Sequence, residues 1–194
     1  MRLQGKRIAG RRIMRTEKYL QDSLGGLLNK KSIEKIRIND IIESVGACKG
    51  TFYRYYQDKY QLLTSYFKTY LYDSVVSECH SALDFLTTCL EFFKANSKVF
   101  VNSFCSMDDS GVRVYHEKLL FEYFLKELVL PEKEEDALFI KNILRLYASN
   151  CTEILLYWAS KAPHKPISAV LYFMEQAKPL VLLEASKEKP NKKK

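Results

Sequence analysis

The stretch ACKGTFYRYYQDKYQLL, residues 47–63, combines side chains that bind nucleic acid with side chains that fill a core. Basic residues Lys49, Arg54 and Lys59 alternate with aromatic ones. Ammonium and guanidinium groups bind phosphate oxygens, and phenol groups donate hydrogen bonds to them. We therefore interpret the stretch as a segment with one buried side and one side that meets a polyanion. The aromatic residues are Phe52, Tyr53, Tyr55, Tyr56 and Tyr60.

Patterns for catalysis and metal binding are weak by comparison. Two Ser-x-x-Lys sequences begin at Ser32 and Ser65, but the companion motifs of the acyl-transfer enzymes with this pattern do not occur. The five cysteines include no Cys-x-x-Cys pair and the three histidines are far apart in sequence, so we expect reduced thiols and no metal site. No phosphate-binding glycine loop or nucleophile elbow is found. We therefore expect no enzyme activity and no cofactor.

Positive charge is concentrated at the start of the chain. The first 60 residues hold 14 Lys and Arg against six Asp and Glu, a net charge of +8, whereas the remaining residues hold 17 of each kind. A basic domain followed by a neutral one indicates a polyanion partner. No secretory signal and no run of 18 apolar residues is found, so we expect a cytoplasmic protein.

Helical periodicity runs through nearly the whole chain, which predicts an all-α fold. Apolar residues recur at helical spacing from Ile13 to Leu28, and the pair Gly25-Gly26 in this helix suggests the close approach of another helix. A longer helix with an apolar face, residues 59–72, is expected to link two domains. Further helices are expected at 81–95, 97–106, 112–130, 131–160 and 167–183, with a loop at 107–111 and a kink at Pro179.

A helix-turn-helix fits the segment around the opening stretch. Residues 38–45 make about two helical turns, and Gly46 follows where a left-handed residue ends a helix. A second helix follows at residues 49–56, in which Phe52 and Tyr56 are four apart and point inward. The opposite face of this second helix is then free to enter the major groove of DNA.

Each side chain on the predicted DNA face has a matching role. Lys49 reaches phosphate or guanine, Gly50 lets the backbone approach a strand, and Thr51 offers a hydroxyl and a methyl group to thymine. Lys59, in the first turn of the next helix after the cap at Asp58, is expected to clamp a phosphate. The predicted DNA-binding residues are Arg37, Asn39, Lys49, Gly50, Thr51, Tyr53, Arg54, Tyr55 and Lys59. The basic residues 2–15 either follow the adjacent minor groove or make only diffuse contacts.

Residues 13–71 resemble the N-terminal domain of the TetR family of bacterial transcriptional regulators. The family pattern corresponds to Ser44 to Leu62 of this sequence. It contains a small residue, Gly, a small apolar residue, a capping residue, Lys or Arg, Gly, Thr, an aromatic residue and Tyr, followed later by Asp, Lys and Leu. Cys48 replaces the capping Ser or Thr, and Tyr55 replaces a frequent His. The resemblance implies about nine helices, arranged as a flexible basic arm (1–10), a DNA-binding domain (11–58, helix-turn-helix 37–56), a regulatory and dimerisation domain (59–186) and a disordered basic tail (187–194).

The resemblance also implies a homodimer, formed through helices 131–160 and 167–183, that binds a palindromic operator in double-stranded DNA. Such a repressor is released by a small effector, here hydrophobic or aromatic, and the aromatic residues of the second domain either line its pocket or simply form the core. The alternative is a regulator, repressor or activator, that a partner protein controls instead. The expected pocket residues are Phe92, Phe104, Tyr123, Tyr147, Cys151 and Trp158.

Overall fold

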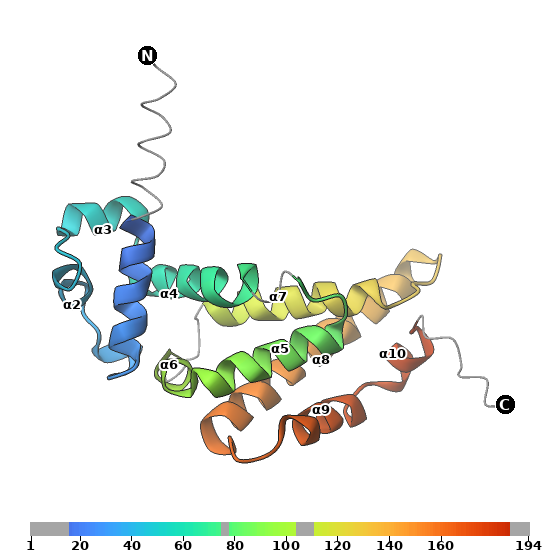
Figure 1. The fold of residues 1–194 in the computed structure, drawn as a ribbon. Helices are drawn as coiled ribbons and strands as arrows, with labels where there is room; N and C mark the ends of the chain where they lie inside the picture. Colours follow the sequence, from blue (N-terminus) through green and yellow to red (C-terminus); the bar gives the residue numbers. More distant parts are fainter. Residues whose placement is uncertain (1–15, 75–77, 104–110, 187–194) are drawn as a thin grey trace. The chain divides into compact units, whose positions relative to one another are not determined.

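The computed structural model describes residues 16–74, 78–103 and 111–186. Within these ranges the chain forms helices joined by turns, and its one strand-like feature is an isolated bridge between Leu128 and Ser186 (Figure 1). The predicted all-α class is confirmed. The helices are residues 16–28, η1 (Ile33–Lys35), α2 (Ile38–Glu43), α3 (Lys49–Tyr55), α4 (Lys59–Phe67), the π-helical η2 (Lys68–Asp73), α5 (Ala82–Ala95), α6 (Ser97–Ser103), α7 (Gly111–Lys126), α8 (Glu134–Lys161), α9 (Ile167–Gln176) and α10 (Leu180–Glu184).

Some predicted segments lie outside the described residues. These are the basic arm, residues 1–10, the tail, residues 187–194, and nearly all of the loop at 107–111. No helix in the described ranges has both the length and the apolar character needed to cross a membrane.

The chain divides into two compact units. The first comprises Met1–Tyr72 and Lys98–Val112, and the second comprises Asp73–Ser97 and Arg113–Lys194. Helix α4 belongs to the first unit, whereas the division expected from the sequence begins the second domain at residue 59.

The core of the first unit is built from the apolar faces that helical spacing predicts. Leu20, Leu24 and Leu28 of the first helix are fully buried, because residues four apart lie on one side of a helix. Leu62 and Phe67 of α4 are buried as well, as are apolar residues of the turns and of α2 and α3. Full burial of a leucine or phenylalanine contributes roughly 1.5–3 kcal/mol to folding. The core residues of the intervening segments are Ile33, Ile36, Ile41, Ile42 and Phe52.

Close packing explains why residue 25, but not residue 26, is a glycine. A Cβ atom added at Gly25 would lie 2.8 Å from Cε2 of Tyr66, whereas one at Gly26 would meet nothing within 4 Å. Gly25 therefore lets Tyr66 pack directly on the first helix, which confirms the expected close approach. Gly26 is open to substitution.

The second unit is organised around the long helix α8. This helix packs against α5, α9 and α10, and Figure 1 shows α5 and α9 running beside it. Three acidic residues, Glu134 to Asp136, occupy its first turn, where they favour the positive end of the helix dipole. The predicted start at Pro131 is wrong, because Lys133 is the N-cap and residues 131–133 precede the helix. The helix expected over 167–183 is divided into α9 and α10 at Pro179, the N-cap of α10.

His116 of α7 lies in the apolar interior of the second unit. Its ring packs 5.3 Å from that of Phe85 and 6.4 Å from that of Phe93, both on α5. Burial disfavours the imidazolium and lowers the pKa of His116 from 6.5 to about 4. The folded chain therefore holds His116 neutral at pH values where the unfolded chain protonates it.

We predict that acid weakens the fold through His116. The folded pKa lies below the unfolded one, so this contribution to stability is complete above pH 6.5 and is lost as pH falls towards 4. Between pH 7 and pH 5 the loss is about 2 kcal/mol in the free energy of unfolding. Denaturant titrations at both pH values should show this loss in the wild type and a correspondingly smaller one in His116→Gln. The exposed His164, changed to Gln, is the control and should behave as wild type; equal pH dependence in all three chains would contradict the prediction.

Candidate nucleic-acid interface

Helices α2 and α3 form the predicted helix-turn-helix segment within the first unit. Asp40 accepts hydrogen bonds from the Lys31 ammonium at 2.6 Å and from the Arg37 backbone N–H at 3.0 Å, which fixes the first turn of α2. The Lys31 hydrogen bond is the main reason that the pKa of Asp40 is lowered. Gly46 has φ = 63°, so the predicted left-handed residue after α2 is confirmed. Residues 44–48 then turn the chain into α3.

Helix α3 has one buried and one bare side. Phe52 is fully buried and Tyr56, the C-cap residue, is 5% exposed, while Tyr53 is 55% exposed. Lys49 and Arg54 are exposed on the same side as Tyr53. This is the division that the helical period predicts. Ile41 and Ile42 of α2 are buried, whereas Val45 in the turn after α2 is only half-buried.

A polar cluster holds the end of α3 on the rest of the unit. The buried Gln21 amide of the first helix donates to Ser65 Oγ at 2.9 Å and to Thr69 Oγ1 at 3.2 Å. The Tyr56 hydroxyl lies 3.2 Å from the same Ser65 oxygen. We call Gln21, Tyr56 and Ser65 the anchor cluster. No local sequence pattern predicts these contacts of Ser65, because its partners Gln21 and Tyr56 lie 44 and 9 positions away.

The bare side presents groups suited to phosphate and base edges. The Arg54 guanidinium lies 5.3 Å from the centre of the Tyr55 ring, which is half-buried and tilted against Tyr56. This cation–π contact restrains the guanidinium on the surface. Arg37 and Asn39 are exposed at the start of α2. The structure thus brings Arg37, Asn39, Lys49, Gly50, Tyr53 and Arg54 to the surface of one unit, with Thr51 and Tyr55 half-buried beside them.

Lys59 differs from the other predicted contacts because its ammonium is used inside the unit. Its Nζ donates to the backbone carbonyls of Glu34 and Ile36, both at 3.0 Å. Burial lowers the pKa of Lys59, and the group is half-buried rather than exposed. Two of its three N–H donors therefore tie the start of α4 to the turn before α2. Asp58 caps the same helix as predicted, accepting from the backbone N–H groups of Tyr60 and Gln61 at 2.8 Å.

Gly50 lies in the first turn of α3, and no contact inside the described chain requires a glycine there. The nearest atom to an added Cβ would be the Cys48 sulfur, at an ordinary contact distance of 3.9 Å. Its φ is not in the left-handed region, since Gly46 has the only positive glycine φ of the described residues. The open space around Gly50 is compatible with the expected approach of a DNA strand to α3, which stays a prediction.

Cys48 occupies the N-cap of α3 but makes no capping hydrogen bond to the backbone. Its sulfur lies 3.3 Å from Thr51 Oγ1, and this hydrogen bond is the main reason that the pKa of Cys48 is lowered. The substitution for the usual Ser or Thr thus leaves a weak cap, while the helix itself is kept.

The residues expected around an effector divide between core and surface. Cys151 is fully buried and burial raises its pKa to about 12, while Tyr147 donates to the Met174 carbonyl at 2.8 Å. The Trp158 indole donates to the Lys165 carbonyl at 2.9 Å. These three side chains of α8 therefore have structural partners. Phe92 and Tyr123 are half-buried, and Phe104 lies outside the described residues.

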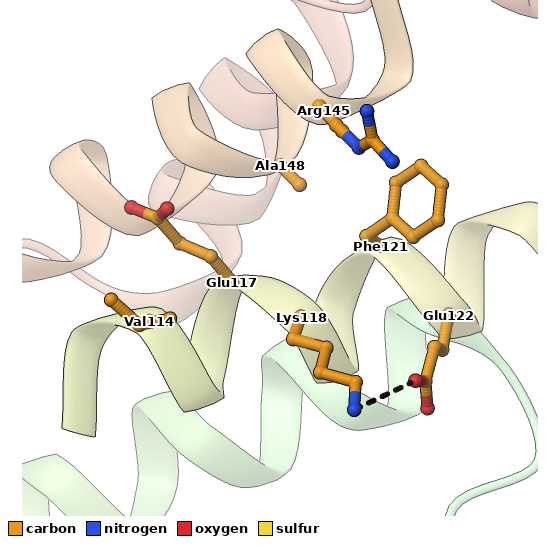
Figure 2. Close-up of a pocket in the computed structure, with 7 residues that line it drawn as sticks. All are labelled: Val114, Glu117, Lys118, Phe121, Glu122, Arg145 and Ala148. Atoms are coloured by element: carbon orange, nitrogen blue, oxygen red, sulfur yellow. Dashed lines mark ion pairs between the residues drawn. The ribbon is translucent and has the colours of Figure 1, made fainter. Parts of the chain in front are cut away.

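A hollow of about 370 Å³ lies between α7 and α8, bordered by none of the six residues expected to line a pocket (Figure 2). We call it the α7–α8 hollow. Its lining residues are Val114, Glu117, Lys118, Phe121, Glu122, Arg145 and Ala148.

Two of the solved structures that match this chain span nearly its whole length. A TetR transcriptional regulator from Streptococcus agalactiae 2603V superposes with a TM-score of 0.63 and 18% identity, covering 94% of this chain and 99% of its own. The dihydroxyacetone kinase operon activator DhaS superposes with a TM-score of 0.60 and 15% identity, covering 89% and 98%. No protein-family model and no curated protein matches the sequence. The chain has the all-helical fold of a TetR-type regulator.

Proposed function

We propose that this protein is a DNA-binding transcriptional regulator without enzyme activity. The observation that carries the proposal is the bare side of α3, where Lys49, Tyr53 and Arg54 stand exposed on a helix anchored by Phe52. A helix presented in this way by a helix-turn-helix fits the major groove. Two of the solved structures with the same fold are those of a transcriptional regulator and an operon activator.

The charge distribution supports a nucleic acid as the partner. The net charge of +8 within residues 1–60 lies in the part of the chain that contains α2 and α3. Binding to phosphates by such a surface releases counterions and depends strongly on salt. The basic residues 2–15 would add to this attraction, either in the minor groove or diffusely.

A homodimer is supported by apolar residues that the second unit leaves exposed. Phe139, Leu146 and Tyr157 of α8 are 60%, 69% and 66% exposed, and their spacing of seven and eleven residues places them on one side of the helix. We call these residues the apolar stripe. The other side of α8 already packs into the core, so the helix is apolar on two sides. A second copy of the chain would cover the stripe.

Residues of α9 and α10 extend the surface beside the stripe. Phe139 and Leu146 border a groove of about 450 Å³ whose other wall includes Pro179, Leu180 and Val181. Leu180 is 68% exposed. This surface fits the expectation of a dimer formed through α8 and the helices that follow it.

Two-fold symmetry implies a palindromic operator, with half-sites about 34–36 Å apart. We propose repression, relieved by a small effector that binds the second unit and favours a conformation unsuited to that spacing. A hundredfold preference of the effector for this conformation gives a coupling of about 2.7 kcal/mol, which lowers operator affinity by the same factor. The alternative is a regulator, including an activator, that a partner protein controls; the shared fold with DhaS, an operon activator, is the observation that favours activation.

We predict that Lys49→Ala lowers DNA affinity by removing a contact with the phosphates or with a base. If the contact is with phosphate, the dependence of log K on log salt on a random-sequence duplex should decrease by about one unit. If Lys49 binds guanine, the loss on the preferred sequence is about 1–3 kcal/mol and base preference relaxes at one position. Fluorescence anisotropy titrations at several salt concentrations measure both, with the exposed Lys94→Ala on α5 as the control. Equal binding by the two variants would remove Lys49 from the interface.

Gly50→Ala is predicted to separate folding from binding. Alanine stabilises helices by up to about 1 kcal/mol relative to glycine, and the site has room for the methyl group, so stability should rise or stay unchanged. DNA affinity should fall, because the methyl group would stand between α3 and the DNA strand.

Gly26→Ala is the matched control for this change, since it also lies on a helix of the first unit with open space around it. It should gain stability without losing affinity. Chemical denaturation and anisotropy on the same preparations give the two quantities. Undiminished binding by Gly50→Ala would argue against close approach of DNA at α3.

Leu146→Glu is predicted to weaken the dimer by at least about tenfold, because it places a charge in the middle of the apolar stripe. Sedimentation velocity over a range of concentrations measures the monomer–dimer equilibrium. Leu83→Glu introduces the same charge at a site on α5 that is 60% exposed and outside the stripe, and should leave the equilibrium unchanged. A monomeric wild type, or equal effects of the two changes, would contradict a dimer through α8.

A further inference from the structure

We propose that the α7–α8 hollow binds a small organic carboxylate with a compact apolar body, held by Arg145. Its volume of about 370 Å³ lies at the lower end of the range for small-molecule sites. Figure 2 shows the Arg145 guanidinium beside the Phe121 ring at one end of the hollow, with the Ala148 methyl group next to them between the two helices.

The other charges that border the hollow already have partners. Glu117 accepts from Arg113 Nε at 3.0 Å and from Ser149 Oγ at 3.2 Å. Lys118 pairs with Glu122 at 4.0 Å, as the dashed line in Figure 2 marks. Among the charged side chains that line the hollow, Arg145 is therefore the one without an ion-pair partner in the described residues, although the charges of the lining sum to zero.

Arg145 itself has no carboxylate within ion-pair distance in the described part of the chain. Its Nη1 donates to the Asn142 side-chain oxygen at a long 3.4 Å, and its Cζ lies 5.5 Å from the centre of the Phe121 ring. This cation–π contact restrains the guanidinium and leaves N–H donors without a carboxylate partner. Such donors match the two oxygens of a carboxylate.

The remaining lining residues favour a ligand with an apolar group and a single negative charge. Phe121 and Ala148 offer apolar surface beside the guanidinium, and Val114 adds apolar surface at the other end of the hollow, which suits a compact ring or short hydrocarbon. A dianionic group such as phosphate would bring a second negative charge near Glu117 and Glu122 without a further free cation. The geometry therefore favours a monoanion attached to an apolar group.

An effect of this ligand on DNA binding would rest on the proposed function, but its binding to the hollow would not. The two are therefore measured separately. Binding to the full-length chain without DNA tests the hollow, and anisotropy of a labelled duplex without the carboxylate tests the regulator.

The probe is 4-fluorobenzoate, followed by ¹⁹F NMR titration at constant ionic strength, with 4-fluorobenzamide as its uncharged counterpart. We expect the benzoate to bind at least about fivefold more tightly than the amide, and acetate at equal concentration not to displace it. Arg145→Gln should weaken benzoate binding by about five- to tenfold and leave amide binding unchanged. Arg145 is exposed, so this variant should fold as the wild type does.

Lys161→Gln is the matched control, because it removes the same charge from the same helix 16 residues away, about 24 Å along α8. It should bind benzoate as the wild type does. A second variant, Val114→Glu, places a carboxylate at the exposed edge of the hollow and should also weaken binding. Equal binding of benzoate and benzamide, no binding of either, or an Arg145→Gln chain that binds like the wild type would overturn the proposal.

The DNA measurements distinguish the two failures. If the chain binds benzoate through Arg145 but binds no duplex, the proposed ligand site is supported and the proposed regulator function is contradicted. If it binds the duplex but shows no Arg145-dependent binding of benzoate, the proposed regulator function is supported and the proposed ligand site is contradicted.

Discussion

A helix of seven residues is not stable alone in water, so α3 exists because one of its sides is buried. Phe52 supplies most of that burial and packs its ring edge-on to Tyr53 at 5.5 Å, which connects the buried side with the bare one. The anchor cluster fixes the orientation of α3, since the Tyr56 hydroxyl and the Gln21 amide both contact the same Ser65 oxygen. Every outward group of α3 takes its position from these few contacts.

Because each helix buries one side in the core, its other side is left for a partner, and the residues on that side decide which kind of partner fits. Helix α3 leaves a charged side outside the core, and α8 leaves an apolar one, the stripe around Leu146. A charged, bare helix side suits DNA, and an apolar one suits another protein surface. The α7–α8 hollow has a third character, a guanidinium without an ion-pair partner in the described residues, next to apolar side chains. The three surfaces differ in chemistry, so a change in one need not disturb the others.

Local sequence signals predict the local structure well. The period of apolar residues places Phe52 and Tyr56 inward, and the cap at Asp58 and the left-handed Gly46 lie where residue type demands them. Each of these depends on neighbours within a few residues. Gly25 differs, because its lack of a side chain predicts a close neighbour but the local sequence does not indicate that this neighbour is the distant Tyr66.

Contacts between distant residues could not be predicted in this way. Lys59 has the position of a phosphate clamp, but its ammonium reaches carbonyls 23 and 25 residues earlier in the chain. The α7–α8 hollow depends on Phe121 and Arg145 lying side by side, and no spacing in the sequence indicates this. Acids after Pro131 indicate a helix start but do not decide which residue is the cap, so the sequence pattern predicts the start of α8 too early.

In the proposed regulator, two copies of α3 contact DNA with two-fold symmetry. Repeated selection of duplexes from a random pool by the full-length protein, followed by sequencing, tests it without assuming any operator sequence. We expect an enriched inverted repeat whose two halves are separated by about one helical turn or a multiple of it. Enrichment of a single asymmetric half-site, or no enrichment at all, would contradict the claim.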